Sequence, residues 1–139
     1  MRDSRGFTLI ELMMALAVVA ILTAVALPSY SAYVQRSRVP VALDALSAYS
    51  TRLEQRYQDT GSYASGTACW GTAPDAKDFT VSCSIGSSGQ TFTATATGSG
   101  TMAGYTYTLD SSGTRKTTAH PKGTPSTNCW TTKGVTCDT

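Results

Sequence analysis

The strongest constraint on this chain is an apolar run that begins at its seventh residue. Residues 7–27 read FTLIELMMALAVVAILTAVAL, and only Thr8, Glu11 and Thr23 interrupt the apolar side chains. As an α-helix, which rises about 1.5 Å per residue, this run would span roughly 31 Å. That length matches the hydrocarbon thickness of a lipid bilayer. The sequence therefore predicts a membrane-spanning helix.

A cleavable secretory signal is the first alternative for this run. Residues 24–26 read Ala-Val-Ala, a small-residue pattern typical of a signal-peptidase site. Glu11 argues against it, because a carboxylate in an apolar core costs on the order of 2–4 kcal/mol at membrane depth. A discarded segment has no reason to carry that cost. A simpler interpretation of Glu11 also stays open, in which its side chain lies near the interface and reaches the lipid headgroups.

The six residues ahead of the run, MRDSRG, are too short for a signal peptide and end in Gly6. Cleavage after Gly6 would keep the apolar run on the mature protein and make Phe7 its first residue. The new amine and the carboxylate of Glu11 are opposite charges in a medium that solvates neither, so pairing them is favourable and leaving either unpaired is costly. A staggered contact of this kind between copies propagates without closing, which predicts a helical filament.

Residues 6–12, GFTLIEL, are very similar to the processing site of type IV pilins and the related pseudopilins. In that family a prepilin peptidase cuts after the glycine and methylates the new N-terminal amine. The resemblance implies cleavage at Gly6, N-methylation at Phe7 and a filament-assembly role for Glu11. It covers about the first 35 residues. The expected parts are a removed leader (residues 1–6), a hydrophobic transmembrane and assembly segment (7–27), and a periplasmic or extracellular head (28–139).

The same resemblance implies a structural subunit that assembles through its N-terminal helix into a surface filament. The subunit would sit as a single-pass protein in the inner membrane of a Gram-negative cell. It would then join other pilin subunits in an extracellular pilus, by way of an inner-membrane assembly platform. Such pili serve twitching motility and cell adhesion. The NCW triplet at residues 128–130, before Cys137, is similar to PilE-type minor pilins, so a minor pilin is expected.

Beyond Pro28 the chain remains compatible with a helix but becomes amphipathic. Apolar residues recur at spacings of three and four and form one stripe. The stripe consists of Val39, Leu43, Leu46, Tyr49, Leu53 and Tyr57. Gly61 supplies a stop signal, so one helix is predicted from residue 7 to about residue 58, roughly 78 Å long. Pro28 and Pro40 lie within it, and each removes a backbone donor and invites a kink.

Three later segments, which begin near Phe79, Phe92 and Tyr105, alternate strictly between apolar and hydroxyl-bearing residues. This period is typical of antiparallel strands with one buried and one wet face. Turns rich in glycine and serine separate the segments, and a fourth short strand is expected at residues 114–118. The apolar face can pack only on the amphipathic part of the helix. The predicted fold class is α+β, with a long protruding N-terminal α-helix packed on a small antiparallel β-sheet, as in type IV pilins.

The four cysteines lie in the polar C-terminal part, and an even number in a small polar domain predicts disulfides formed outside the cytoplasm. They are Cys69, Cys83, Cys129 and Cys137. Of three possible pairings, the local one, Cys69 with Cys83 and Cys129 with Cys137, fits the sequential layout best. Zinc is a weaker alternative, because no C-x-x-C pair exists and the only histidine, His120, is not suitably spaced. We expect no metal site and no cofactor.

The sequence offers no catalytic constellation. It has one histidine, expected to be a solvated loop residue, and no nucleophile motif, phosphate loop or carboxylate cluster. We therefore expect no catalytic residue and no enzymatic activity.

A DNA-binding competence pilin is one alternative function. Residues 111–137 hold a basic strip without any acid, together with Trp130. The strip consists of Arg115, Lys116, Lys122 and Lys133. Such a strip can contact phosphates, and an aromatic residue can stack on bases. The net charge of +2 is too small to imply a nucleic-acid partner by itself, so a solvated basic surface is the favoured interpretation.

A type II secretion pseudopilin is the other alternative, because it shares the N-terminal signature. Pseudopilins often depend on bound calcium. This chain instead has two expected disulfides and lacks an acidic cluster, which favours a pilus subunit.

Overall fold

The structure, a computed structural model, describes residues 6–138. Residues 1–5, which make up most of the expected leader, lie outside that range. The chain divides into two compact units, Met1–Val34 and Gln35–Thr139. One helix, α1 (Leu9–Thr60), contributes residues to both units. The prediction of one long N-terminal helix with an antiparallel sheet is confirmed.

The first unit contains the part of helix α1 up to Val34. Within the described residues, α1 holds the one window long and apolar enough to cross a membrane, with a mean hydropathy of 2.5. None of that window is buried in the chain's own fold. The helix continues without interruption through Pro28 and Pro40.

In the second unit, α1 buries one side against the sheet. The prediction of an apolar stripe is confirmed for Val39, Leu46, Tyr49 and Leu53, whereas Leu43 and Tyr57 are only half-buried. The structure adds two small residues, Ala42 and Ala45, which are also buried. Small side chains on this face let the helix backbone approach the sheet closely.

Helix α1 ends where the sequence predicts a stop. Gly61 adopts a φ of +69°, the left-handed conformation that glycine accepts most readily. Its N–H donates to the carbonyl of Tyr57 at 2.7 Å, which satisfies one of the last helical carbonyls.

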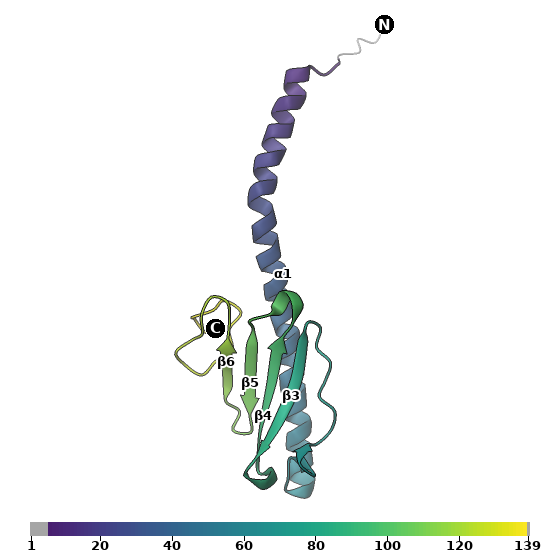
Figure 1. Cartoon of the computed structure of the whole chain (residues 1–139), viewed down its shortest axis with the longest axis vertical. Helices are drawn as coiled ribbons and strands as arrows, with labels where there is room; N and C mark the ends of the chain where they lie inside the picture. Colours follow the sequence, from purple (N-terminus) through teal and green to yellow (C-terminus); the bar gives the residue numbers. More distant parts are fainter. Residues whose placement is uncertain (1–5, 139) are drawn as a thin grey trace. The chain divides into compact units, whose positions relative to one another are not determined.

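The sheet of the second unit has four antiparallel strands in the order β3-β4-β5-β6. They are β3 (Phe79–Gly86), β4 (Thr91–Gly98), β5 (Thr106–Asp110) and β6 (Arg115–Ala119). All four expected strands are present within one or two residues of their predicted positions. A register shift interrupts the β5–β6 pairing between Thr106 and Tyr107. Figure 1 shows α1 behind the strands, with the C-terminal loop beside β6.

The two faces of the sheet differ as the alternation predicts. Phe92, Tyr107 and Leu109 are buried in the core on the helix side, together with Ala94 and Ala96. The outer face carries threonine and serine in aligned rows, because the register pairs hydroxyl-bearing residues across strands. One such row consists of Ser82, Thr95 and Thr108.

A short hairpin that the sequence analysis did not anticipate lies between α1 and β3. Its strands, β1 (Ala64–Ser65) and β2 (Ala68–Cys69), have two residues each. A disulfide from Cys69 to Cys83 ties the hairpin to β3. A second disulfide joins Cys129 to Cys137 in the C-terminal loop. Both are the local pairs, and each crosslinks a segment that has little regular structure of its own.

Side chains near the start of the second unit hold α1 to the loops beside it. Arg38 Nη1 lies 2.6 Å from Asp78 Oδ2 and donates to Thr101 Oγ1 at 3.1 Å. Gln35 donates from its side-chain nitrogen to the Thr101 carbonyl at 3.3 Å. We call the contacts of Arg38 with Asp78 and Thr101 the Arg38 clamp. The contact between Arg38 and Asp78 is the one ion pair among residues 6–138.

Candidate functional site

The start of α1 contains the residues predicted for processing and assembly. Gly6 and Phe7 precede the helix, and the Phe7 side chain is exposed. Thr8 caps the helix, because its hydroxyl oxygen accepts a hydrogen bond from the Glu11 backbone N–H at 3.3 Å. Glu11 therefore lies in the first helical turn, where the helix dipole favours a negative charge.

The sequence contains a signal for this helix start that was not used above. The spacing Thr8-x-x-Glu11 matches the capping box, a pattern that marks the beginning of a helix. The observed bond uses the backbone N–H of Glu11, whereas the capping-box pattern would also use its side chain. An experiment on Glu11 must separate this capping pattern from any role toward another subunit.

The apolar side chains that follow Glu11 have no partner within the described chain. The large ones between residues 12 and 27 are all more than half exposed. They surround the helix instead of forming a single stripe, which is typical of a helix buried in lipid or among other helices. A surface of this extent requires such a partner.

Arg115 and Trp130 form the second group of candidate residues, this time in the second unit. Arg115 is the first residue of β6, and its guanidinium carbon lies 4.9 Å from the centroid of the Trp130 ring. This is a cation–π contact, worth about 0.5–1 kcal/mol at an exposed site. The indole N–H donates to the Thr108 carbonyl at 2.9 Å, which fixes the orientation of the ring.

The backbone around Trp130 is fixed by bonds to β5 and β6. The carbonyl of Cys129 accepts from the N–H of Thr117 at 2.9 Å, and the N–H of Thr131 donates to the Thr117 hydroxyl at 3.0 Å. Tyr107 adds a bond from its hydroxyl to the Thr131 carbonyl at 2.9 Å. These bonds tie residues 129–131 to β5 and β6, and the Trp130 side chain is thereby fixed within the fold.

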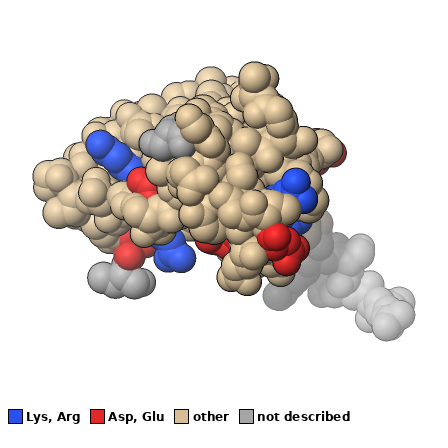
Figure 2. All heavy atoms as spheres, turned by 90° about the horizontal axis from the view of Figure 1, so that it is seen from below, with Lys and Arg blue, Asp and Glu red and all other residues tan. Residues whose placement is uncertain are grey.

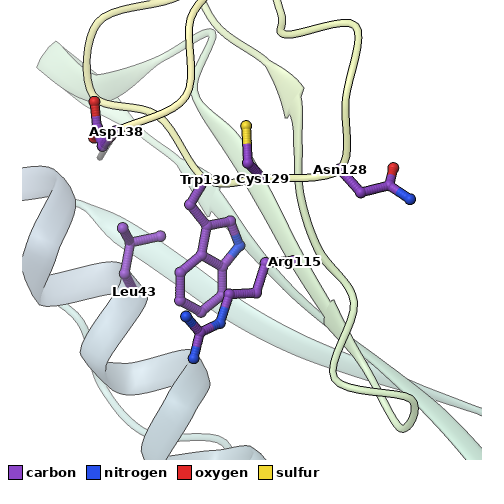
Figure 3. Close-up of a pocket in the computed structure, with 6 residues that line it drawn as sticks. All are labelled: Leu43, Arg115, Asn128, Cys129, Trp130 and Asp138. Carbon is purple, nitrogen blue, oxygen red and sulfur yellow. The ribbon is translucent and has the colours of Figure 1, made fainter.

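A cavity of about 320 Å³ opens beside this pair. Figure 3 shows the Trp130 indole with the Arg115 guanidinium on one side and Leu43 of α1 on another. The lining residues are Leu43, Arg115, Asn128, Cys129, Trp130 and Asp138. Within the described part of the chain, no carboxylate lies within ion-pair distance of Arg115. The cavity thus combines an aromatic ring, an apolar wall and the cation of Arg115 with the carboxylate of Asp138, whose Oδ2 accepts a hydrogen bond from the Thr132 N–H at 2.7 Å.

The structure does not gather the other predicted cations around Trp130. Lys116 follows Arg115 directly and pairs with Thr108, so its side chain lies on the opposite, hydroxyl-bearing face of the sheet. Lys122 and Lys133 are exposed in the turn after β6 and in the C-terminal loop. In Figure 2, cations are scattered over a mostly uncharged surface, with acidic side chains near several of them.

The expectation that His120 is a solvated loop residue is wrong. His120 is buried, and its ring packs edge-on against Tyr105, with the ring centroids 4.7 Å apart. Its Nδ1 accepts a hydrogen bond from the backbone N–H of Lys122 at 3.0 Å. Gly134 lies against the same turn at a φ of +119°, and a Cβ there would approach the Lys122 Cβ to 2.9 Å. The C-terminal loop therefore covers a histidine that the sequence places next to a proline.

Burial is the main cause of a lowered pKa at His120. The backbone of Thr132 and the charge of Asp138 raise the pKa against this effect, whereas the charges of Lys122 and Arg36 lower it further. The ring is therefore held in its neutral form, which agrees with the hydrogen-bond acceptor role of Nδ1. The imidazole serves the packing of the loop.

Metal binding has no support among residues 6–138. No three side chains of the His, Cys, Asp and Glu types come together there in a way that would hold an ion. All four cysteines are in disulfides.

Comparison with known protein families gives two matches. The family model described as "Type IV minor pilin ComP, DNA uptake sequence receptor" matches residues 28–108, more than half of the chain. The model for the prokaryotic N-terminal methylation motif matches residues 1–27. Together these models cover the apolar segment, the amphipathic helix and most of the sheet.

Curated relatives are fimbrial proteins. The fimbrial protein EcpC of Eikenella corrodens is 39% identical over 69 residues, which are 50% of this chain and 45% of that protein. A fimbrial protein of Pseudomonas aeruginosa is 44% identical over 54 residues, which are 39% of this chain and 35% of that protein. The chain thus spans less than half the length of the curated relatives it matches.

Solved structures with a similar fold include two pilins. A type IV pilin from Shewanella oneidensis matches 70% of this chain and 98% of its own, with a TM-score of 0.54 and 21% identity. The non-core minor pilin PilV of Neisseria meningitidis matches 70% of this chain and 99% of its own, with the same TM-score and 17% identity. At these identities the similarity concerns the fold.

Proposed function

The chain belongs to the type IV pilin family that the ComP model describes, and from this premise we propose that it is a minor subunit of a type IV pilus. The observation that carries the proposal is the first part of α1. Its large apolar side chains are exposed all around the helix, and an acidic residue, Glu11, lies in its first turn. Such a helix is suited to a membrane first and to a bundle of identical helices afterwards.

In the proposed sequence of events, a prepilin peptidase removes residues 1–6 and methylates the amine of Phe7. Residues 7–27 hold the subunit in the inner membrane of a Gram-negative cell, and residues 28–139 form the head outside the cytoplasm. An inner-membrane assembly platform then moves the subunit into the filament. There the Phe7 amine of one copy pairs with Glu11 of another, because neither charge is well solvated in an apolar helix bundle. The filament supports twitching motility and cell adhesion.

The mass and N-terminal residue of the chain from native membranes test the first step. We expect an N-methylated Phe7. A chain that begins at Leu27, after the Ala-Val-Ala pattern, would instead identify an ordinary exported protein. Replacement of Gly6 by valine should leave the precursor uncut, because a bulky side chain at the cleavage site blocks the peptidase.

Replacement of Glu11 by alanine tests the assembly step. We expect the variant to be processed and inserted in the membrane but largely absent from sheared filaments. Asp44→Ala is the matched control, because Asp44 is another exposed acid on α1, and it should enter filaments normally. Glu11→Gln isolates the effect of the charge, since it keeps the capping-box pattern. Normal incorporation of both Glu11 variants would refute the charge-pairing step.

DNA binding is a second candidate function, and the Arg115–Trp130 pair favours it. An exposed guanidinium on a fixed indole, beside an open cavity, can bind a phosphate while the ring stacks on a base. The ComP model, whose description names a DNA uptake sequence receptor, matches only up to residue 108. The candidate therefore depends on the local geometry of Arg115 and Trp130.

Retention of DNA by the full-length chain in detergent micelles tests this candidate. Arg115→Gln should weaken retention by more than its neighbour Lys116→Gln, which removes the same charge from the opposite face. Stacking contributes about 1–3 kcal/mol per base, so Trp130→Leu should weaken retention about tenfold. Equal retention by Arg115→Gln and the unaltered chain would end this candidate.

A further inference from the structure

The segment that follows β6, residues 120–128, has little contact with the rest of the second unit. His120 is its one buried residue, Pro125 is half-buried, and the others are exposed. The two ends of the segment are fixed, because β6 pairs with β5 before it and a disulfide holds Cys129 after it. The position of the chain between these ends therefore depends chiefly on His120.

His120 fits closely into its site. Its ring packs edge-on against Tyr105, with the ring centroids 4.7 Å apart. The C-terminal loop lies directly against the same ring, since a Cβ on Gly134 would be 3.4 Å from His120 Nδ1. The same Cβ would be 2.9 Å from the Cβ of Lys122. The ring and the turn after it thus meet the loop through close van der Waals contacts.

The loop against which His120 packs is held together by its own hydrogen bonds. The Thr131 hydroxyl oxygen accepts from the backbone N–H groups of Lys133 and Gly134 at 3.0 and 3.1 Å. The same hydroxyl donates to the Thr136 carbonyl at 2.6 Å, and Thr131 itself is fully buried. This loop therefore keeps its shape when His120 leaves, and the exposed segment that carries His120 is the part that can move.

A proton on the His120 ring disturbs this site directly. Nδ1 accepts a hydrogen bond from the Lys122 N–H at 3.0 Å, which requires Nδ1 to carry no proton. Protonation makes both ring nitrogens donors, so two N–H groups would then point at each other. Nε2 is buried without a hydrogen-bond partner among the described residues, so a charge on the ring would be poorly compensated.

The charged groups around His120 do not remove this cost. Burial lowers the pKa of the ring most, and Lys122 in the same turn and Arg36 of α1 lower it further. The backbone of Thr132 and the charge of Asp138 raise the pKa, but less than the other effects lower it. A ring exposed to water would regain the ordinary histidine pKa of about 6.5. Acid therefore favours a form of the chain in which His120 has left its site.

We propose that His120 is a pH-sensitive latch, which holds residues 120–128 against the C-terminal loop when neutral and releases them when protonated. The released form exposes Tyr105, which is buried when the latch is closed. The sheet and the disulfide-bonded loop stay folded, because their own bonds do not involve the imidazole. The head thus presents one surface near neutral pH and another in acid, whether or not the chain is part of a pilus.

Hydrogen exchange of the full-length chain in detergent micelles, followed by NMR, tests the latch. After correction for the intrinsic pH dependence of exchange, protection of the Lys122 amide should fall by up to about tenfold per pH unit between about pH 6.5 and pH 5. The Thr117 amide, which is bonded to the Cys129 carbonyl, should stay protected over the same range. His120→Gln should remove the pH dependence at Lys122, because its side-chain oxygen can accept the same hydrogen bond and does not titrate.

The charges beside the ring should change the size of this response. Lys122→Gln removes a cation that disfavours the protonated ring in the closed form, so the loss of protection at residue 122 should become smaller. Asp138→Asn removes the anion that favours the protonated ring but keeps an acceptor for the Thr132 N–H, so the loss should become larger. The opposite order of these two variants would contradict the latch.

Other results would overturn the proposal in different ways. Full protection of the Lys122 amide at pH 5 in the unaltered chain would show that the segment is not released. An equal loss of protection in His120→Gln would assign the response to another group. A simultaneous loss at Thr117 would show that acid unfolds the second unit as a whole instead of opening the segment alone.

Discussion

The two parts of α1 are equally helical but differ in what surrounds them. Up to Tyr33, its large apolar side chains are all exposed, whereas six side chains between Val39 and Leu53 are buried in the core of the second unit. The first part is apolar on every side, and the second has one apolar stripe. One continuous helix thus contains two different sequence patterns. Only the apolar side chains of the second pattern are buried by the rest of the chain. The other pattern identifies the part of the molecule that requires external partners.

The largest expected difference between the two parts concerns truncation of a leucine. Leu53 is fully buried and Leu16 is 61% exposed. Leu53→Ala should lower the free energy of unfolding by about 2–5 kcal/mol. Leu16→Ala should change it by less than about 0.5 kcal/mol. Both tryptophans lie in the second unit, so their fluorescence during urea unfolding in micelles measures this quantity. A large effect of Leu16→Ala would show that the first part also stabilises the head.

Enlarging an alanine sharpens the same comparison. Ala42 is fully buried where α1 meets the sheet, and Ala15 is exposed. Ala42→Leu should destabilise the second unit by about 1–3 kcal/mol, because a well-packed core has no room for the added methylenes. Ala15→Leu should leave its unfolding midpoint unchanged. An Ala42→Leu variant of normal stability would mean that α1 packs loosely on the sheet.

The Arg38 clamp lies just beyond the boundary between the two parts and should have a smaller effect. Arg38 and Asp78 are both partly exposed, so solvent screening limits their interaction to about 1 kcal/mol or less. Arg38→Gln, Asp78→Asn and the double variant form a double-mutant cycle that isolates this term. Hydrogen exchange should also become faster at the α1 amides near residue 38. If hydrogen exchange at these amides did not change, the apolar stripe alone would hold α1 to the sheet.

Acid should produce the smallest effect, confined to the second unit. Folding favours the neutral ring, because the pKa of His120 is lowered in the folded chain, chiefly by burial. Stability should therefore be full above about pH 6.5, the ordinary pKa of histidine, and decline as the pH falls below it. Unfolding measured down to about pH 5, above the range of ordinary carboxyl groups, should show this decline. His120→Gln should abolish it, and an equal decline in that variant would assign the effect to other groups.

Much of the fold follows from local patterns. The alternation that begins at Phe79 and Phe92 predicts β3 and β4, and the left-handed Gly61 marks the end of α1. The alternation in the strands is clear because one face of each strand packs on the core and the other face is exposed to water. The apolar stripe of α1 is less complete, since Ala42 and Ala45 are too small to stand out by hydrophobicity.

Features set by tertiary contact could not be predicted in this way. Strands β1 and β2 have two residues each, which is too short for an alternation of apolar and polar residues. The sequence therefore does not predict this hairpin. His120 is buried by a loop that follows it in the chain. The cation–π contact of Arg56 with Trp70 joins α1 to a residue 14 positions later. Because Trp70 lies beyond the end of α1, the spacing of residues along the helix does not predict this contact. Of the two arginine–tryptophan contacts, only the one between Arg115 and Trp130 joins residues that the sequence marks together, because both belong to the same acid-free strip.

The disulfides have a consequence for how copies of this chain meet. An uncovered edge strand invites another chain to add to the sheet and leads to aggregation. Here the Cys69–Cys83 bridge holds the hairpin beside β3, and the Cys129 carbonyl occupies the backbone N–H of Thr117 in β6. Each disulfide thus places an irregular segment next to one of the two edge strands. At these two points the segments hinder the approach of a further strand from a neighbouring subunit.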